Sequence, residues 1–268
     1  MPEPRALSIA GSDSGGGAGI QADLKTFQAH GVWGMTAITA VTVQNTKGVS
    51  GYDEIRADIV ADQIRAVVPD IGVDAAKTGM LASSAIIEAV ADAIEETGVP
   101  NLVVDPVFVS KHGHALLQEH AVDALRSRIL PLATIVTPNL PEAAGITGRS
   151  VETEADMRRA GEAILALGPR AVLVKGGHLE GSEAMDLLVT ADGAERISEA
   201  RVDTPHTHGT GCVLSAAIAA NLALGRDLET AVRAGKAFVT RAIEGHLEIG
   251  EGIGPVNPSW RPAPVTPP

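Results

Sequence analysis

Short runs of apolar residues alternate with amphipathic segments along most of this chain. Aliphatic and β-branched runs predict strands at 5–10, 36–44, 74–78, 102–104, 134–136 and 171–174, and a hairpin from 185–190 and 195–197. The amphipathic segments predict helices at 18–30, 58–68 (stopped by Pro69), 83–97, 119–129, 153–167, 211–224 and 228–243. This alternation favours a mainly parallel sheet with helices on both faces. We therefore expect an α/β fold, a single-domain three-layer α/β/α sandwich, over residues 1–254.

Composition limits the functions open to the chain. Hydrophobic residues make up 45% of its 268 residues, which is enough for a large core. A formal net charge of −12 and the lack of a basic stripe argue against a nucleic-acid partner. No apolar run is long enough to cross a bilayer and no signal peptide is recognisable, so we expect no membrane partner and a cytoplasmic location. The proline-rich tail, 255–268, is expected to lie outside the fold or to wrap over it.

Polar residues and glycines follow several predicted strands at the points where the strands end. The residues in question are Gly11, Gln44, Asp105, Asn139, Glu142 and Lys175. In open parallel sheets, ligands bind beyond the carboxyl ends of the strands. We therefore expect these side chains to meet at one edge of the sheet and to form a binding site there.

The segment His208–Cys212 leads directly into an alanine-rich helical run. Backbone N–H groups at the start of a helix, next to small residues, bind anions, and the helix dipole adds a partial positive charge there. Cys212 is the only cysteine of the chain, so no internal disulfide is possible. A thiol at a helix N-terminus is biased toward thiolate and can accept a proton or attack. The alternative is a small-residue helix start in which Cys212 packs as an inert hydrophobe.

Seven motifs follow one another along the chain. They are Ala10–Asp23, Val41–Thr46, Lys77–Leu81, Asp105–Val107, Thr137–Ala143, Val174–His178 and His208–Cys212. In this order they resemble the hydroxymethylpyrimidine/phosphomethylpyrimidine kinases of thiamine biosynthesis, which belong to the ribokinase-like superfamily. A Gly-x-x-x-x-Gly-Lys-Ser/Thr segment does not occur, so the chain is not expected to be a P-loop kinase.

The resemblance implies a kinase that uses ATP and Mg²⁺. Its acceptor would be 4-amino-5-hydroxymethyl-2-methylpyrimidine, which is phosphorylated to the monophosphate and then to the diphosphate. The amides of Gly209, Thr210 and Gly211 would form an anion hole for the transferring phosphoryl group. Cys212 would be the catalytic base, as a thiolate with a lowered pKa.

The same resemblance assigns further roles on the phosphate side. Asp105 and Glu142 would hold Mg²⁺ directly or through water, because hard cations take oxygen ligands. Asn139 would bind phosphate or a metal-bound water. Lys175 would bridge phosphate oxygens as a mobile point charge. A helix-capping carboxylate at Glu142 and a solvated lysine at Lys175 are the structural alternatives.

On the acceptor side, five residues match positions that line the family's pyrimidine pocket: Gly11, Asp23, Gln44, Met80 and Val107. The amide of Gln44 offers a donor and an acceptor, which match the ring nitrogen and the amino group of an aminopyrimidine. The alternatives are that Met80 and Val107 are core residues, that Asp23 is a charge on a helix surface, and that Gln44 only caps a strand.

Two other functions fit the same motifs. One is a related kinase that phosphorylates pyridoxine or pyridoxal, whose rings also carry a hydroxymethyl group. The other is a non-catalytic vitamin-binding protein on the same scaffold, against which Asp105, Glu142, Lys175 and Cys212 speak. The resemblance further implies a homodimer.

Overall fold

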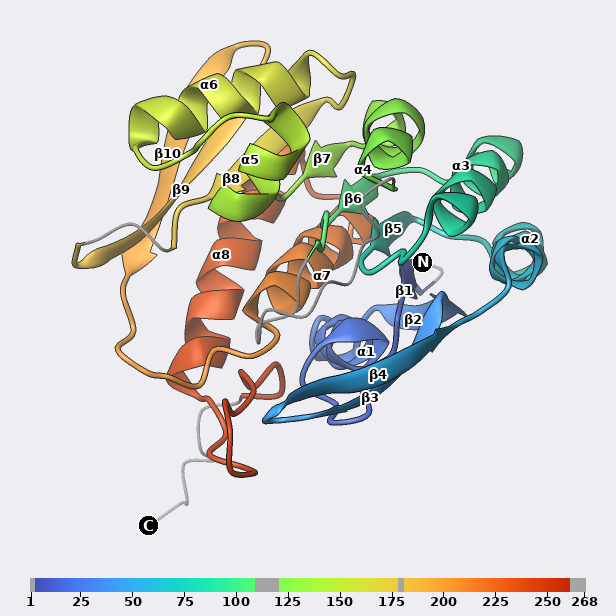
Figure 1. Ribbon diagram of the computed structural model, residues 1–268, viewed down its shortest axis with the longest axis horizontal. Coiled ribbons are helices and arrows are strands. Elements are labelled where there is room, and N and C mark those ends of the chain that lie inside the picture. The colour runs from blue at the N-terminus through green and yellow to red at the C-terminus, as the bar shows by residue number, and fades with distance from the viewer. Residues whose placement is uncertain (1–2, 109–120, 178–180, 261–268) are drawn as a thin grey trace.

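A twisted sheet runs through the centre of the computed structural model, which describes residues 3–108, 121–177 and 181–260 (Figure 1). Within these residues the sheet has eight strands. In spatial order they are β10 (Gly193–Ala200), β9 (Glu183–Thr190), β8 (Ala171–Lys175), β7 (Ile135–Val136), β6 (Leu102–Val104), β5 (Ala75–Thr78), β1 (Arg5–Ala10) and β2 (Trp33–Ile38). Neighbours from β2 to β8 are parallel, whereas β9 and β10 add an antiparallel hairpin at one edge.

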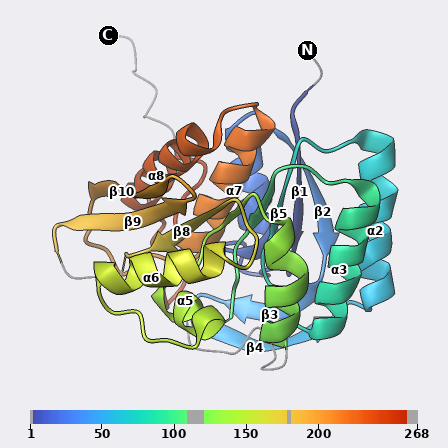
Figure 2. The same cartoon turned by 90° about the horizontal axis from the view of Figure 1, so that it is seen from above.

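Helices cover both faces of this sheet (Figure 2). One face carries α2 (Ala57–Ile71), α3 (Ser84–Thr97), α4 (Ala121–Ala124), α5 (Leu140–Thr147) and α6 (Glu154–Leu165), and the other carries α1 (Gly19–Ala29), α7 (Thr210–Ala223) and α8 (Leu228–Glu244). Successive strand residues point to opposite faces, so Leu7 packs in the first core and Ala6 in the second. The predicted three-layer α/β/α sandwich is confirmed.

The prediction of one strand over 36–44 is wrong. The chain forms β2 up to Ile38, and then leaves the sheet to form β3 (Ala40–Asn45), which pairs with β4 (Gly48–Glu54) in a separate antiparallel hairpin. Thr39 lies at the break, where its N–H donates to Ala10 O and its hydroxyl donates to Met80 O. The first bond is the last of the parallel β1–β2 ladder, and the second joins the Thr39 side chain to the segment after β5 at the point where the chain leaves the sheet. Gln44 therefore lies on this hairpin instead of ending a strand of the main sheet.

Pro69 does not stop its helix, contrary to the prediction. Helix α2 continues to Ile71, with Pro69 in its last turn. A proline removes one backbone hydrogen bond and crowds the preceding turn, but near the end of a helix few bonds remain to be lost. The chain instead ends the helix at Gly72, whose φ of 84° favours glycine.

The C-terminal segment up to Trp260 lies against the fold. Val256 is 1% exposed, and its N–H donates to His208 O at 3.0 Å. The N–H of His208 in turn donates to Gly254 O at 3.2 Å. These bonds hold the chain that enters α7, and residues 261–268 of the proline-rich tail lie outside the described part.

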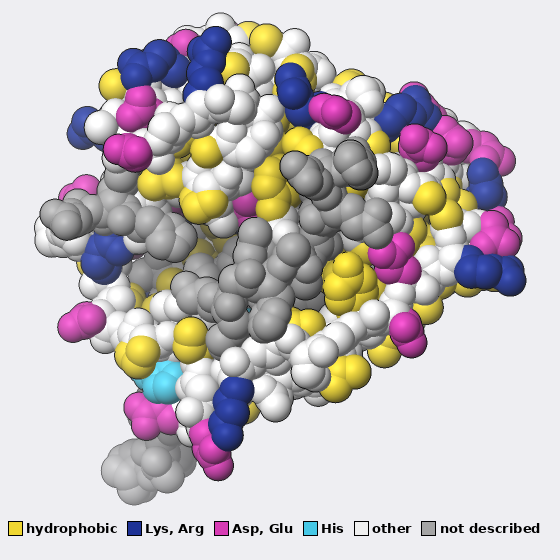
Figure 3. Space-filling view, in the orientation of Figure 1, with side chains coloured by type: hydrophobic (Ala, Val, Ile, Leu, Met, Phe, Trp, Pro, Cys, Tyr) yellow, Lys and Arg dark blue, Asp and Glu magenta, His cyan; other side chains and the backbone are white. Residues whose placement is uncertain are grey.

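No membrane-spanning helix occurs in the described part of the chain, since none combines the necessary length with enough apolar residues. Lys and Arg side chains are interspersed with Asp and Glu around the rim of the face in Figure 3. The described part of that face therefore carries no continuous basic stripe.

Candidate active site

Lys175 lies between two carboxylates at the carboxyl edge of the sheet. Its Nζ is 2.9 Å from Asp105 Oδ1 and 3.8 Å from Glu142 Oε2. Asp105 directly follows β6, and Lys175 is the last residue of β8, so the parallel register brings them together. The side chain of Lys175 is 14% exposed, which means that it is not a solvated surface lysine.

The carboxylate of Asp105 has further polar neighbours. Thr137 Oγ1 donates to its Oδ1 at 3.3 Å, and Ser215 Oγ of α7 is 3.3 Å from its Oδ2. Burial raises the pKa of Asp105, but the charges of Lys175 and Lys77 outweigh it and hold this pKa below its ordinary value. Asp105 is therefore ionised near neutral pH.

Asn139 and Glu142 form a capping box at the start of α5. Asn139 Oδ1 accepts from the Glu142 N–H at 2.8 Å, and Glu142 Oε2 accepts from the Asn139 N–H at 2.7 Å. Burial, reinforced by the charge of Asp105 and opposed by that of Lys175, raises the pKa of Glu142 to about 7. The capping role expected as the alternative for Glu142 is thus present, and the cap also holds its carboxylate beside Lys175.

The turn before α7 packs closely against the glycine-rich turn that follows β1. Gly209 has a φ of 81°, and a Cβ atom there would overlap the carbonyl oxygen of Gly17. Only glycine satisfies both constraints. A Cβ atom on Gly211 would lie 3.3 Å from Lys175 Nζ and 3.6 Å from Asp105 Oδ2. The fold therefore brings the predicted anion-hole glycines close to Lys175 and its two carboxylate neighbours, Asp105 and Glu142.

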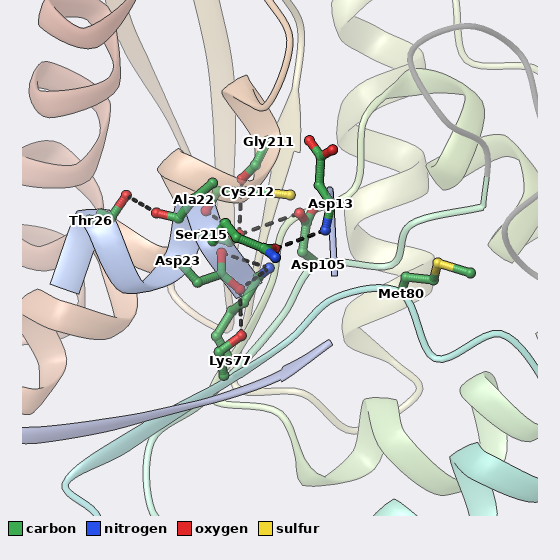
Figure 4. A network of polar contacts seen from close by, with 12 residues as sticks. Asp13, Ala22, Asp23, Thr26, Lys77, Met80, Asp105, Gly211, Cys212 and Ser215 are labelled. Carbon is green, nitrogen blue, oxygen red and sulfur yellow. Dashed lines mark hydrogen bonds and ion pairs between the residues drawn. The ribbon is translucent and has the colours of Figure 1, made fainter. Parts of the chain in front are cut away.

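Close to this edge lies a buried ion pair that the sequence pattern did not indicate. Lys77 and Asp23 are both 0% exposed, and Lys77 Nζ is 2.9 Å from Asp23 Oδ2 (Figure 4). Ser8 Oγ donates to the same oxygen at 2.5 Å. The alternative of a helix-surface charge at Asp23 is wrong. Because both partners of Asp23 are buried, we expect it to act on the site through Lys77.

A lysine inside a strand of small, apolar residues was the available signal for this pair. Lys77 occupies the middle of β5, where every residue is buried. Burial lowers the pKa of Lys77, but the charges of Asp23, Cys212 and Asp105 outweigh burial and raise it above its ordinary value. A buried ammonium in a strand needs a carboxylate partner, and that requirement could have been inferred before the partner was known.

The expectation of a lowered pKa at Cys212 is wrong for the ligand-free protein. Burial raises the pKa of its thiol to about 11, although the charge of Lys77 lowers it. The carboxylates of Asp23 and Asp105 add to the effect of burial. Desolvation and two nearby negative charges thus outweigh the charge of Lys77 and the hydrogen bond from the Gly19 backbone at this position.

We expect slow alkylation of Cys212 as a result. A rise in thiol pKa from 9.0 to about 11 leaves a thiolate fraction near pH 7.5 that is about a hundredth of the ordinary one. Because the chain has no other cysteine, mass spectrometry after iodoacetamide treatment reports on this thiol alone. The rate should keep rising from pH 7 to pH 10, with the unfolded protein as control. A plateau below pH 8 would contradict the raised pKa.

Three predicted acceptor residues lie near one another at the ends of β1, β5 and β6. A Cβ atom on Gly11 would lie 3.2 Å from Met80 Sδ, and Val107 lines a small cavity with Gly79 and Leu81. Met80 is 7% exposed, and Figure 4 shows it to one side of the polar contacts around Lys77 and Asp23. Met80 is therefore a core side chain as well as a neighbour of the site.

Gln44 reaches the site from the β3–β4 hairpin. Its Nε2 is 3.4 Å from Nε2 of His208, the residue before the anion-hole turn. Its backbone is held by Ser14, whose Oγ accepts from the Gln44 N–H and lies 2.8 Å from Gln44 O. The side chain is thus available at the rim of the site, whereas the backbone carries the structural bonds.

Asp13 is a second residue near the site that the sequence pattern did not indicate. Its carboxylate accepts from the N–H groups of Gly15, Gly17 and Ala18 and lies 2.8 Å from His208 Nε2. This one side chain therefore ties the glycine-rich turn to the segment that enters α7. The signal was an aspartate that immediately precedes a run of small residues with free N–H groups.

The sequence model of one protein family, described as phosphomethylpyrimidine kinase, matches residues 13–257. The chain belongs to this family. The hydroxymethylpyrimidine/phosphomethylpyrimidine kinase of Streptomyces coelicolor is 53% identical over 257 residues, which cover 96% of this chain and 95% of that protein. The resemblance described above is confirmed, and the chain is a kinase of this family.

Two solved structures extend the likeness to the fold. A phosphomethylpyrimidine kinase from Clostridium difficile 630 has a TM-score of 0.80 at 46% identity, covering 90% of this chain and all of that one. An ADP complex of Bacillus subtilis pyridoxal kinase has a TM-score of 0.90 at 42% identity, covering 96% of this chain and 98% of that one. The ribokinase-like fold that the resemblance implied is thus confirmed.

Proposed function

We propose that this kinase uses MgATP to phosphorylate 4-amino-5-hydroxymethyl-2-methylpyrimidine and then the resulting monophosphate. The single observation that carries this function is the meeting of Lys175, Asp105 and Gly211 at the start of α7. A lysine, a carboxylate and bare helix N–H groups are the parts that phosphoryl transfer to an alcohol requires.

In the proposed reaction, Lys175 moves from Asp105 toward the phosphates of ATP. Its ammonium is protonated at all relevant pH values, because Asp105 and Glu142 outweigh burial and raise its pKa. The N–H groups of Gly209, Thr210 and Gly211 receive the charge that develops on the transferring phosphoryl group. Cys212 takes the hydroxyl proton of the acceptor.

The raised pKa of Cys212 changes how this proton transfer works. With a pKa of about 11, only a small fraction of the Cys212 thiol is ionised near neutral pH, but the thiolate that does form is a strong base. Phosphoryl transfer proceeds through a loose transition state, so little deprotonation of the alcohol is needed early. Lys77 supplies the positive charge beneath Cys212 that favours the thiolate.

Mg²⁺ fits the donor set of the site. Asp105 and Glu142 present hard carboxylate oxygens beside Lys175, and each carboxylate also accepts a hydrogen bond that fixes its direction. These two residues would hold the ion directly or through water, and the ion would neutralise phosphate charge. Asn139, whose Oδ1 caps α5 by accepting from the Glu142 N–H, would bind phosphate or a metal-bound water.

The choice of acceptor is tested directly by ADP release. Wild-type protein should turn over the aminopyrimidine alcohol and its monophosphate faster than pyridoxal at equal concentrations. Pyridoxal is the second candidate because a structural neighbour with a TM-score of 0.90 is a pyridoxal kinase. A higher kcat/KM for pyridoxal would make that the principal activity, and no ADP release with any of these acceptors would remove the proposal.

We predict that Gln44→Leu separates the two acceptors. The Gln44 amide pairs with the ring nitrogen and amino group of the aminopyrimidine, and a buried polar edge left unpaired costs about 1–3 kcal/mol. The kcat/KM for the aminopyrimidine should fall about tenfold to a hundredfold, with a much smaller change for pyridoxal. Val43→Leu on the exposed side of β3 is the matched control. Equal losses for both acceptors would assign Gln44 to the scaffold.

A homodimer and a cytoplasmic location stay predictions of the resemblance and the composition. Light scattering on the purified protein would measure its mass against the 27.5 kDa of one chain.

A further inference from the structure

A second buried ion pair joins α8 to β9, the strand that pairs with β8 and its last residue, Lys175. Lys236 on α8 is 6% exposed, and its Nζ is 2.7 Å from Oδ2 of Asp186 on β9. Asp186 is 2% exposed, and its other oxygen, Oδ1, accepts from the Gly176 N–H at 3.0 Å. One carboxylate thus joins the charge on a distant helix to the backbone next to Lys175.

Hydrogen bonds and close packing hold the backbone at Lys175 and Gly176 in place. The Lys175 N–H donates to Pro138 O at 2.8 Å, and Lys175 is directly opposite Asp186 in the β8–β9 register. A Cβ atom on Gly176 would lie 2.9 Å from Cε of Met157 and would overlap the Met185 carbonyl oxygen. Beyond Lys175, the last residue of β8, the bond from the Gly176 N–H to Asp186 is the next one that fixes the direction of the chain.

The chemistry of the pair favours a positioning function over a purely stabilising one. Two buried charges lose about as much hydration free energy as their attraction returns, and apolar side chains of similar volume are often equally stable. What apolar side chains cannot supply is an acceptor for the Gly176 N–H. Lys236 contacts the other oxygen of the Asp186 carboxylate, Oδ2, so that Oδ1 faces the Gly176 N–H.

We propose that Asp186 and Lys236 are positioning residues, which set the place of Lys175 by fixing the Gly176 N–H. The proposal rests on the proposed function only in assigning Lys175 to the phosphates. A shift of about 1 Å in a group that acts on the transition state can cost about a hundredfold in rate. Loss of the Gly176 bond should therefore lower kcat and leave binding of the pyrimidine unchanged.

The test compares two double variants without an unpaired charge. Asp186→Asn with Lys236→Met keeps a carbonyl acceptor for Gly176, whereas Asp186→Leu with Lys236→Met removes it. The Asn variant should keep its kcat within about threefold of wild type, and the Leu variant should lose about tenfold to a hundredfold. The KM for the pyrimidine alcohol should be the same in both. Equal kcat values in the two variants would overturn the proposal.

A readout without turnover keeps this test separate from the proposed function. Amide hydrogen exchange at Gly176, measured by NMR on the ligand-free protein, should be slow in wild type and in the Asn variant and fast in the Leu variant. Ile87→Ala in the core on the other side of the sheet controls for general loss of stability. If Gly176 exchanged equally in both double variants, the proposal would fail even for an active enzyme. If the contrast held but wild type used no pyrimidine, only the proposed function would fail.

A pair of single variants covers the case in which the Leu variant does not fold. Lys236→Arg keeps a positive charge behind Asp186, whereas Lys236→Met leaves the carboxylate without a cation. The Arg variant should recover at least tenfold in kcat relative to the Met variant, with the same KM for the pyrimidine. Equal kcat values for Arg and Met would count against Lys236 as a positioning residue.

Discussion

Replacement of Cys212 by alanine is expected to lower kcat by about 100-fold to 10,000-fold, the range that a positioned general base contributes. The protein should still fold, because alanine is smaller than cysteine and fits at the start of a helix. ATP binding should persist, since the N–H groups of the turn and Lys175 remain. Steady-state ADP release and calorimetric ATP titration measure the two quantities.

Cys212→Ser is the matched control for this experiment. Serine keeps a hydrogen-bonding side chain of similar size, but its hydroxyl is a much weaker acid than a thiol and is not ionised near neutral pH. It should therefore resemble alanine in kcat while supporting the same fold. Turnover close to wild type in the alanine variant would remove Cys212 from the mechanism and leave it as a small packed side chain.

Gly209→Ala is expected to lower kcat by at least about 100-fold, the loss typical of one disabled oxyanion-hole donor. Alanine at this position has to adopt a φ of 81°, and its methyl group overlaps the carbonyl oxygen of Gly17. The turn must therefore move away from the glycine-rich loop, and its N–H groups move with it. The kcat and the melting temperature of the variant report the two consequences.

Gly225→Ala separates backbone strain from the overlap with Gly17. Gly225 has a φ of 78°, close to that of Gly209, but no atom lies within 4 Å of a Cβ atom there. This control should cost about 1–2 kcal/mol of stability and leave kcat unchanged. If Gly209→Ala lost stability like the control and kept its activity, the turn would not be the anion hole.

The sequence alone determined the layers of the fold and the meeting of several polar residues at the carboxyl edge of the sheet. Short aliphatic strands that alternate with amphipathic helices have few ways to bury both sheet faces, so the sandwich followed from local patterns. The positions of Asp105 and Lys175 at strand ends followed from the same rule for parallel sheets. The break after Ile38 was not predicted, because β-branched residues continue on both sides of it and the tertiary bond from Thr39 to Met80 O is not a local feature.

Only the tertiary structure decided the electrostatics of the site. The helix start at Cys212 suggested a lowered thiol pKa, because the dipole and the N–H groups are local features. The pKa rises instead, chiefly because the fold buries the thiol, and Asp23 and Asp105, which are far away in the sequence, add to the effect. The pairs Lys77–Asp23 and Lys236–Asp186 likewise join segments separated by about 50 residues. Burial and charge pairing depend on which segments meet, and local sequence does not encode that.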